Sequence, residues 1–275
     1  MALNVADPAR TARELAGDHP VLQLHELSKS YGGVLALDRV TLDVRQGEMM
    51  GVIGANGSGK TTLLNVLSGI TRPTGGSFTF DGVPSAAFAG RPERAARLGL
   101  SRTFQGIRMV PGLDLLSNVV LGAYSRRTTT LMGQMLRTRA ARLENQAAAA
   151  LAAQLLNDVG VDHASCSSIG GLPYGTLRRI EIARALMPRP RLLLLDEPTA
   201  GMTARETAEV FELLHDRVTK GTSVMVVEHD VAAIARHCDR IAVLNFGKLL
   251  ALGPAGDVLR SQDVVEAYVG SRARV

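Results

Sequence analysis

The sequence predicts an α/β fold around a mainly parallel β-sheet, and two segments carry this prediction. A glycine-rich run follows the apolar segment 49–53 and opens a helix at 61–67. Four leucines at 192–195 lead directly into two carboxylates, which is typical of a buried parallel strand that ends at a ligand crevice. Since 46% of the 275 residues are hydrophobic, we expect one sizeable core within a single catalytic unit.

The glycine-rich run fits the pattern G-x-x-x-x-G-K-[ST] of a nucleotide phosphate loop. Its glycines let backbone N–H groups turn toward the β- and γ-phosphates, Lys60 supplies a mobile charge, and the Thr61 hydroxyl is placed to bind Mg²⁺. A plain glycine turn is the alternative, but the strand before it and the helix after it favour the phosphate loop. The expected nucleotide-binding residues here are Gly54, Ala55, Asn56, Gly57, Ser58, Gly59, Lys60, Thr61 and Thr62.

The two carboxylates after the leucine strand, Asp196 and Glu197, predict catalytic chemistry. The carboxyl ends of parallel strands meet at one edge of a sheet, so we expect both side chains beside the phosphate loop. Asp196 would hold the Mg²⁺ shell and Glu197 would polarise the attacking water. Asp-Glu-Pro alone also fits a helix cap, an interpretation that the phosphate loop makes less favourable.

The remaining elements follow in chain order. Residues 1–20 are predicted to be a polar extension, and 21–275 a single domain with a C-terminal extension from about 253. Alternating apolar residues predict strands around 22–24, 40–44 and 78–80. Helical periodicity occurs at 93–98, 114–121 and 140–159, so that residues from about 91 to 188 form a mainly helical arm. The core then resumes with a strand at 192–196, a helix at 204–219, and strands at 223–227, 241–244 and 248–252.

Further motifs occur between and around these segments, in one fixed order. They are Tyr31, the phosphate loop, Phe104-Gln105, the signature segment Leu172-Pro173-Tyr174-Gly175-Thr176, Asp196-Glu197 and Glu228-His229-Asp230. In this order they resemble the ATP-binding cassette (ABC) family. The resemblance implies that Tyr31 stacks on adenine, Gln105 senses Mg²⁺ and the transporter, and His229 contacts the γ-phosphate. Taken singly, these three residues also fit a turn aromatic, a solvated loop residue and an ordinary helix-start histidine.

The resemblance also implies an architecture and a mechanism. The expected fold is a P-loop NTPase (RecA-like) ABC cassette core with an inserted helical subdomain and an N-terminal antiparallel β subdomain. ATP then lies between two cassettes, and the signature segment with the helix 176–186 acts on the partner's ATP through its N–H groups. Ile107, Met109 and Leu113 are candidates for the groove that receives a permease coupling helix.

Some details are similar to one branch, the ATP-binding subunits of branched-chain amino acid importers. These details are Pro73-Thr74-Gly75-Gly76, the segments 99–105 and 178–186, Val227 before the Glu-His-Asp motif, and Ala267-Tyr268-Val269-Gly270. That branch implies ATP and Mg²⁺ as cofactors and a place on the inner face of the cell membrane. Its implied partners are a second ATPase subunit in a hetero- or homodimer, membrane permeases and, indirectly, an extracytoplasmic solute-binding protein.

The signature segment departs from the usual Leu-Ser-Gly-Gly-Gln. Pro173 removes a hydroxyl and a backbone N–H, and Thr176 shortens a long polar side chain. Thr203 stands where an aspartate or asparagine is common in the family. These changes keep open a nucleotide-gated ABC module with little hydrolysis. A soluble, non-transport ABC ATPase is the other alternative, although the chain has no second cassette, coiled-coil or zinc insertion.

Composition limits the possible functions. No stretch approaches the ~18 apolar residues that span a bilayer, and the N-terminal residues lack an apolar signal core, so we expect a cytoplasmic protein. Cys166 and Cys238 are expected to be free thiols because neither lies at disulfide-framework or zinc spacing. The net charge of +5 suggests an acidic ligand, but 4% aromatic content without tryptophan argues against nucleic acid.

Positive charge concentrates in residues 125–142, which hold five arginines and no carboxylate. The arginines are Arg126, Arg127, Arg137, Arg139 and Arg142. A solvated helical face is the simpler interpretation of such a stretch. A surface that faces the membrane or the permeases is the alternative.

Overall fold

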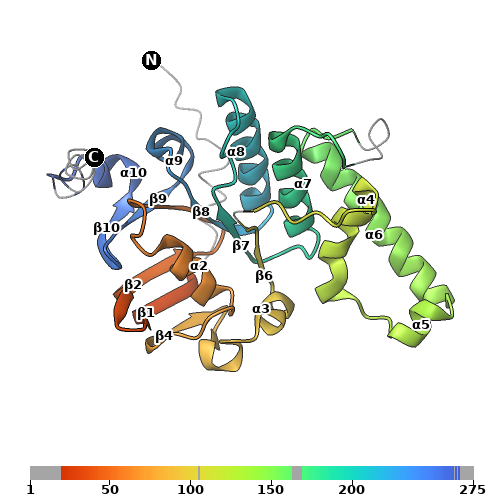
Figure 1. Ribbon diagram of the computed structural model, residues 1–275, viewed down its shortest axis with the longest axis horizontal. Helices are drawn as coiled ribbons and strands as arrows, with labels where there is room; N and C mark the ends of the chain where they lie inside the picture. Colours follow the sequence, from red (N-terminus) through yellow and green to blue (C-terminus); the bar gives the residue numbers. More distant parts are fainter. Residues whose placement is uncertain (1–19, 105, 163–168, 263, 265, 267–275) are drawn as a thin grey trace, which may run out of the picture.

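A computed structural model describes residues 20–104, 106–162, 169–262, 264 and 266 (Figure 1). The predicted extension lies outside these residues except for Pro20, as do Gln105, Cys166 and the end of the predicted C-terminal extension. Within the described part, the chain forms two β-sheets and a group of helices that extends to one side of them.

The larger sheet has six strands in the order β10-β9-β3-β8-β7-β6. All neighbours are parallel except β9 and β10, which form an antiparallel pair. This confirms the predicted parallel core, whereas β6 is a short core strand that the sequence analysis missed within the predicted helical arm. The strands are β3 (Met49–Ile53), β6 (Leu100–Arg102), β7 (Leu192–Asp196), β8 (Ser223–Val227), β9 (Arg240–Asn245) and β10 (Lys248–Pro254).

The four leucines of β7 show how this sheet divides the core. Leu192 and Leu194 belong to one hydrophobic cluster, and Leu193 and Leu195 belong to the other. All four are fully buried. Successive side chains of a strand point to opposite faces, so an uninterrupted apolar run requires a sheet that is covered on both sides.

The smaller sheet is antiparallel, with strand order β2-β1-β4-β5. It shares one hydrophobic cluster with helix α2 (Lys60–Leu67) and one face of the larger sheet, so α2 is enclosed between them. The predicted strands in this region are confirmed but are longer than expected. Their bounds are β1 (Pro20–Tyr31), β2 (Val34–Arg45), β4 (Gly75–Phe80) and β5 (Val83–Pro84), followed by the short 3₁₀ helix η1 (Ser85–Ala87).

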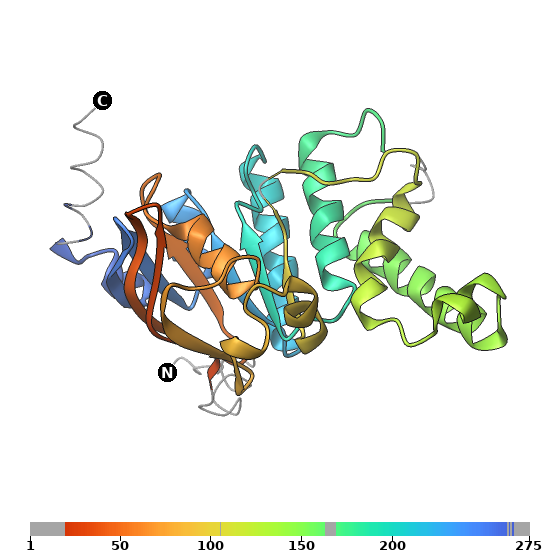
Figure 2. The same ribbon diagram turned by 60° about the horizontal axis from the view of Figure 1, so that its bottom comes forward.

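Helices cover the second face of the large sheet and form the arm. Figures 1 and 2 both show α4, α5 and α6 at the opposite end of the molecule from β1 and β2. No helix in the described ranges combines the length and apolar character that a bilayer crossing requires. The helices are α3 (Pro92–Leu98), α4 (Leu115–Val120), η2 (Leu121–Arg126), α5 (Leu131–Met135), α6 (Arg139–Asp158), α7 (Tyr174–Leu186), α8 (Ala204–Thr219), α9 (Val231–His237) and α10 (Ala255–Val258).

Candidate active site

The carboxyl ends of β3, β7 and β8 meet at a cavity of about 550 Å³. These strands are neighbours in the sheet, so the loops that follow them lie side by side. The structure therefore brings together residues of three separate sequence motifs. The cavity is lined by Ala36, Asn56, Gly57, Ser58, Gly59, Lys60, Thr61, Thr62, Glu197 and His229.

The phosphate loop between β3 and α2 has a backbone that requires glycine. Gly59 has a φ of 105°, and a Cβ on it would lie 2.5 Å from the carbonyl oxygen of Ala36. Next to it, Lys60 Nζ folds back and donates to the carbonyl oxygens of Gly54 at 2.7 Å and Ala55 at 2.9 Å. Gly54 and Ala55 do not line the cavity, but their carbonyl oxygens hold the Lys60 ammonium that does.

Two polar groups of this loop fit an anionic ligand. Burial lowers the pKa of the Lys60 ammonium, opposed by the negative charges of Glu197 and Asp196. Ser58 Oγ is buried and has no hydrogen-bond partner among the described residues. A phosphate would give both groups an acceptor, because its oxygens accept hydrogen bonds from hydroxyl and ammonium groups.

Asp196, at the end of β7, is held by an arginine that the sequence analysis did not select. Arg102 Nη2 donates to Asp196 Oδ2 at 3.2 Å, and Arg102 Nη1 donates to Asn65 Oδ1 at 2.7 Å. Burial raises the pKa of the Asp196 carboxyl, and the Arg102 guanidinium opposes this effect. No sequence pattern predicted the pair, since it depends on the short strand β6 lying next to β7.

Glu197 and His229, the two residues predicted to be catalytic, form a hydrogen-bonded pair at the cavity. His229 Nε2 lies 2.8 Å from Glu197 Oε1, in a hydrogen bond that joins the ends of β7 and β8. Glu197 adopts a φ of 50°, a left-handed conformation that is costly for a side chain other than glycine. Such strain is typical of functional positions, and here it accompanies a carboxylate that lines the nucleotide cavity.

Glu228 fixes the loops that carry this pair. Its Oε1 accepts hydrogen bonds from Thr199 N at 2.9 Å and from Thr199 Oγ1 at 2.7 Å, and its Oε2 accepts from His229 N at 3.2 Å. Burial raises the pKa of the Glu228 carboxyl, while these hydrogen bonds lower it. Glu228 stands in the predicted Glu-His-Asp motif, but its positioning contacts could not be predicted because Thr199 is 29 residues away.

The signature segment lies apart from the chain's own nucleotide cavity. Helix α7 begins at Tyr174, and its N-cap, Pro173, provides no side-chain cap. Leu172, Gly175 and Thr176 are likewise absent from the residues that line the cavity. Pro173 and Tyr174 are exposed at the start of α7 and Gly175 is buried, and the action of this segment on a partner's ATP stays a prediction.

Thr203, the unusual residue after β7, has a local structural role. It is the N-cap of α8, where its hydroxyl accepts from Glu206 N at 3.3 Å and its own N–H donates to Glu206 Oε2 at 2.9 Å. This reciprocal capping box stabilises the first turn of the helix. The hydroxyl of Thr203 is thus used within the chain.

Helix α7 also holds the loop around position 105. Arg178 Nη1 donates to the carbonyl oxygen of Phe104 at 2.6 Å, and Arg108 N donates to Glu181 Oε1 at 3.0 Å. Arg184 Nη1 donates to the carbonyl oxygen of Arg108 at 2.5 Å. These contacts join the signature helix to both sides of the segment that contains the predicted glutamine.

Besides Gly54 and Ala55, two further predicted contacts are not placed in the cavity. Gln105 lies outside the described residues. Tyr31, at the end of β1, is 46% exposed and does not line the cavity, while Lys29 Nζ lies 4.8 Å from its ring centre. The exposed ring leaves room for stacking, so the adenine contact of Tyr31 stays a prediction.

A groove of about 810 Å³ lies between the core and the arm. Residues from α3, β6, η2 and α7 line it, together with Phe104 and Arg108. Ile107, Met109 and Leu113, the residues predicted for the permease groove, are not among its lining residues. Met109 instead packs against the core, so the loop contributes an aromatic ring and a cation to this groove.

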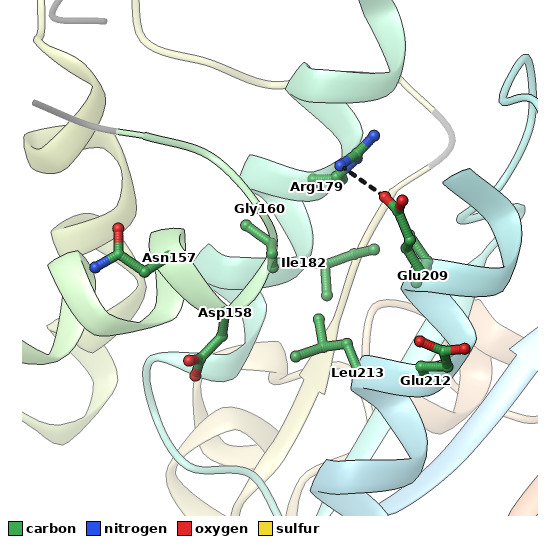
Figure 3. A pocket seen from close by; sticks show the side chains of 10 residues that line it. Asn157, Asp158, Gly160, Arg179, Ile182, Glu209, Glu212 and Leu213 are labelled. Atoms are coloured by element: carbon green, nitrogen blue, oxygen red, sulfur yellow. Dashed lines mark hydrogen bonds and ion pairs between the residues drawn. The ribbon is translucent and has the colours of Figure 1, made fainter. Parts of the chain in front are cut away.

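A smaller cavity of about 310 Å³ lies between the end of α6, α7 and α8 (Figure 3). Arg179 crosses it and pairs with Glu209 at 3.4 Å. Asp158 and Glu212 also line this cavity. None of the predicted nucleotide-binding residues lines it, so this cavity is separate from the one at the phosphate loop.

The described residues contain no group of three or more histidine, cysteine, aspartate or glutamate side chains that could hold a metal ion. Mg²⁺ does not need such a group, because it binds through one or two protein oxygens and completes its shell with waters and substrate phosphates. The Thr61 hydroxyl lines the cavity, whereas the buried Asp196 carboxylate ends β7, two strands from β3, and is not among the lining residues. This oxygen donor set fits Mg²⁺ bound together with a nucleotide.

Comparison with known proteins gives the family. Residues 37–200 match the family model described as ABC transporter. The branched-chain amino acid transport ATP-binding protein LivG of Salmonella typhimurium is 35% identical over 91% of this chain and 98% of its own length. BraF of Pseudomonas aeruginosa, with the same description, is also 35% identical over 91% of this chain and 98% of its length.

Solved structures agree with these relatives. A nucleotide-free ATP-binding cassette from an ABC transporter superposes with a TM-score of 0.78 at 26% identity, covering 91% of this chain and 99% of that one. The ADP conformation of the cassette MJ1267 gives a TM-score of 0.77 at 25% identity, with coverage of 92% and 99%. The chain belongs to the ABC transporter family. It is an ATPase with the cassette fold and the ATP-binding subunit of a transporter.

Proposed function

We propose that this chain binds ATP with Mg²⁺ in the 550 Å³ cavity and hydrolyses it to energise an importer of branched-chain amino acids or related small solutes. The solute class is supported by the LivG and BraF relatives, which are described as branched-chain amino acid transport proteins. The hydrolytic role is supported by one observation above the others, the hydrogen bond between Glu197 and His229 at the cavity.

Different residues at the cavity bind the phosphates and the Mg²⁺ ion. Lys60 and the N–H groups of the loop bind the phosphates, with Ser58 as a further donor. Thr61, Asp196 and Gln105 would hold Mg²⁺, which neutralises phosphate charge when it is bound.

Hydrolysis depends on the pair at the ends of β7 and β8. Glu197 polarises the attacking water, and His229 orients the Glu197 carboxylate and approaches the γ-phosphate. The contacts of Glu228 with Thr199 and with the backbone of His229 hold this pair at the mouth of the cavity.

The proposed partners follow from an incomplete site. The signature segment does not reach the chain's own cavity, so a second ATPase subunit would supply it, in a homodimer or a heterodimer. Membrane permeases would dock in the 810 Å³ groove beside Phe104 and Arg108, and an extracytoplasmic solute-binding protein would act through them. The chain would then lie peripherally on the inner face of the membrane.

A second candidate is a nucleotide-gated module that closes on ATP with little hydrolysis. It is favoured by Pro173, which begins the signature helix without a side-chain hydrogen bond to its first turn. The two candidates differ in turnover of the assembled complex, because only the first releases phosphate continuously.

Replacing Glu197 by glutamine tests the proposal. Glu197→Gln should leave ATP binding nearly intact and slow hydrolysis about 10²- to 10⁴-fold, the range expected for loss of a general base. Steady-state phosphate release of the complex measures this, with Glu212→Gln, an exposed glutamate of α8, as the matched control. Wild-type turnover in Glu197→Gln would remove the catalytic role of Glu197, and negligible wild-type turnover would favour the gated module.

A further inference from the structure

The tip of the helical arm is a surface that has no part in the nucleotide cavity and meets the groove only at its first residue, Ser125. We define the basic tip as residues 125–143, which include α5 and the start of α6. Figures 1 and 2 show α5 at the far end of α6 from the β-sheets. Among the described residues, the tip has no part in the lining of the nucleotide cavity.

The basic tip exposes an unusual amount of apolar side chain. Leu131, Met132, Met135 and Leu136 are each 65–80% exposed, and Leu143 is 57% exposed. Five large apolar residues within thirteen positions are more than the scattered single residues that a solvated surface normally carries. The simpler interpretation of this stretch, a solvated charged face, does not account for them.

Positively charged residues flank these apolar residues in the sequence. Arg137, Arg139 and Arg142 are exposed and form no ion pair with any described carboxylate. Arg126 and Arg127 add two further charges at the end of η2. Together the tip presents a set of cations around a group of flexible leucine and methionine side chains.

The one carboxylate that borders the tip, Glu144, is used to shape it. Glu144 accepts hydrogen bonds from the Thr129 hydroxyl and from Thr128 N at 2.7 Å, and Gln134 also contacts it. These hydrogen bonds, with that of Thr129 foremost, lower the pKa of Glu144 to about 2. Glu144 therefore stays ionised and holds the loop before α5 against α6, which keeps the apolar side chains outward.

The position of the tip agrees with a membrane-facing role. In Figure 1, α5 lies on the same lower side of the molecule as α3, which lines the groove proposed for the permeases. We propose that the basic tip binds the surface of an anionic lipid bilayer directly. The arginines would contact headgroup phosphates, and the α5 side chains would enter the boundary between headgroups and acyl chains.

A bilayer fits this surface better than a protein partner does. Protein interfaces are enriched in rigid aromatic anchors, and the apolar part of the tip, α5 with the start of α6, contains no aromatic residue. The nearest aromatic ring, Tyr124, is exposed and carries the Arg127 guanidinium 5.5 Å from its centre. Apolar side chains bordered by cations instead match the layered charge of an anionic membrane surface. The inference goes beyond the proposed function and can fail without it, because lipid binding by the isolated chain requires neither ATP nor permeases.

Vesicle sedimentation of the full-length chain tests this inference. Wild type should sediment with vesicles of phosphatidylcholine and phosphatidylglycerol at low salt, and much less with phosphatidylcholine alone or at high salt. Arg137→Gln with Arg139→Gln should weaken binding about 30-fold, equivalent to about 1 kcal/mol for each arginine. Met132→Gln with Met135→Gln should also weaken it, by removing the apolar contact.

The matched control is Arg205→Gln with Arg236→Gln, which removes two exposed arginines from α8 and α9 and should leave vesicle binding unchanged. Thermal unfolding of all variants checks their folding. Wild-type sedimentation that does not depend on phosphatidylglycerol, or equal binding by the tip and control variants, would overturn the inference. In another outcome, the tip variants bind vesicles normally and fail only to stay in the detergent-solubilised permease complex. That result would assign the surface to the permeases and would also overturn the inference of lipid binding.

Discussion

The nucleotide cavity and the signature segment differ in how completely they match the functions that the family assigns to them. Around the cavity, Lys60, Asp196, Glu197 and His229 are all present, and hydrogen bonds or an ion pair hold each of them. At the start of α7, Pro173 offers neither a hydroxyl nor a backbone N–H. The residues predicted to act on the chain's own ATP are therefore intact, while those predicted to act on a partner's ATP are altered.

The phosphate loop gives the largest expected effect on ATP binding. Lys60→Ala should weaken ATP binding on the order of 10- to 100-fold, because a charge-assisted hydrogen bond contributes about 1.5–3 kcal/mol. Titration with a fluorescent ATP analogue measures the affinity, and Lys220→Ala, an exposed lysine paired with Asp216, is the control. Unchanged affinity in Lys60→Ala would show that the cavity is not the nucleotide site. The contrast between an intact cavity and an altered signature segment would then have no basis.

A smaller effect is expected from Glu228, whose hydrogen bonds with Thr199 and with the backbone of His229 fix the loops at the cavity. Burial raises the folded-state pKa of Glu228 above its ordinary value of 4.5, so the stability linked to this group is fully present below pH 4.5. It is lost as the pH rises through the raised pKa, by about 1.4 kcal/mol for each pH unit that separates the folded and unfolded pKa values. The side chain of Glu228→Gln cannot titrate, so the variant does not lose this stability. Its free energy of unfolding minus that of wild type should therefore increase as the pH rises.

Denaturant unfolding at a series of pH values from 4 to 8 measures this difference. The series starts below the ordinary glutamate pKa of 4.5 and extends above it. Glu212→Gln, which changes an exposed glutamate of α8, serves as the reference. A constant difference between wild type and Glu228→Gln at every pH would show that the Glu228 pKa is not raised in the folded protein.

The smallest effect is expected from repair of the signature segment. In a complex whose own site is silenced by Glu197→Gln, adding Pro173→Ser and Thr176→Gln should raise the remaining ATPase rate about 2- to 10-fold, since the restored donors together contribute on the order of 1 kcal/mol. Pro84→Ser, an exposed change on β5, is the control. A rate that stays constant or falls would mean that the altered signature is already sufficient.

Much of the fold and part of the site could be predicted from local patterns. The apolar runs before Gly54 and Asp196 predicted the parallel strands, and the cassette fold is confirmed. Strand order then brings the phosphate loop, Glu197 and His229 to one cavity, as the motifs indicated. Their catalytic roles remain predictions.

The residues that reinforce the site were harder to predict because they depend on long-range register. Arg102 reaches Asp196 only because the three-residue strand β6 pairs with β7, and three residues carry little periodicity. Helix α5 was also missed, since Leu131–Met135 is too short for a helical pattern. The outward-facing side chains of this helix are visible only in three dimensions.

Unequal ATP sites in the assembled transporter are the central claim, and two single mutants measured side by side test it most directly. Glu197→Gln in this chain should remove most of the ATPase activity of the reconstituted complex, because the complete site is the one built on this cavity. The matching substitution in the partner ATPase should remove less, because the altered signature of this chain serves that site. Equal losses, or a larger loss from the partner's mutant, would contradict the claim.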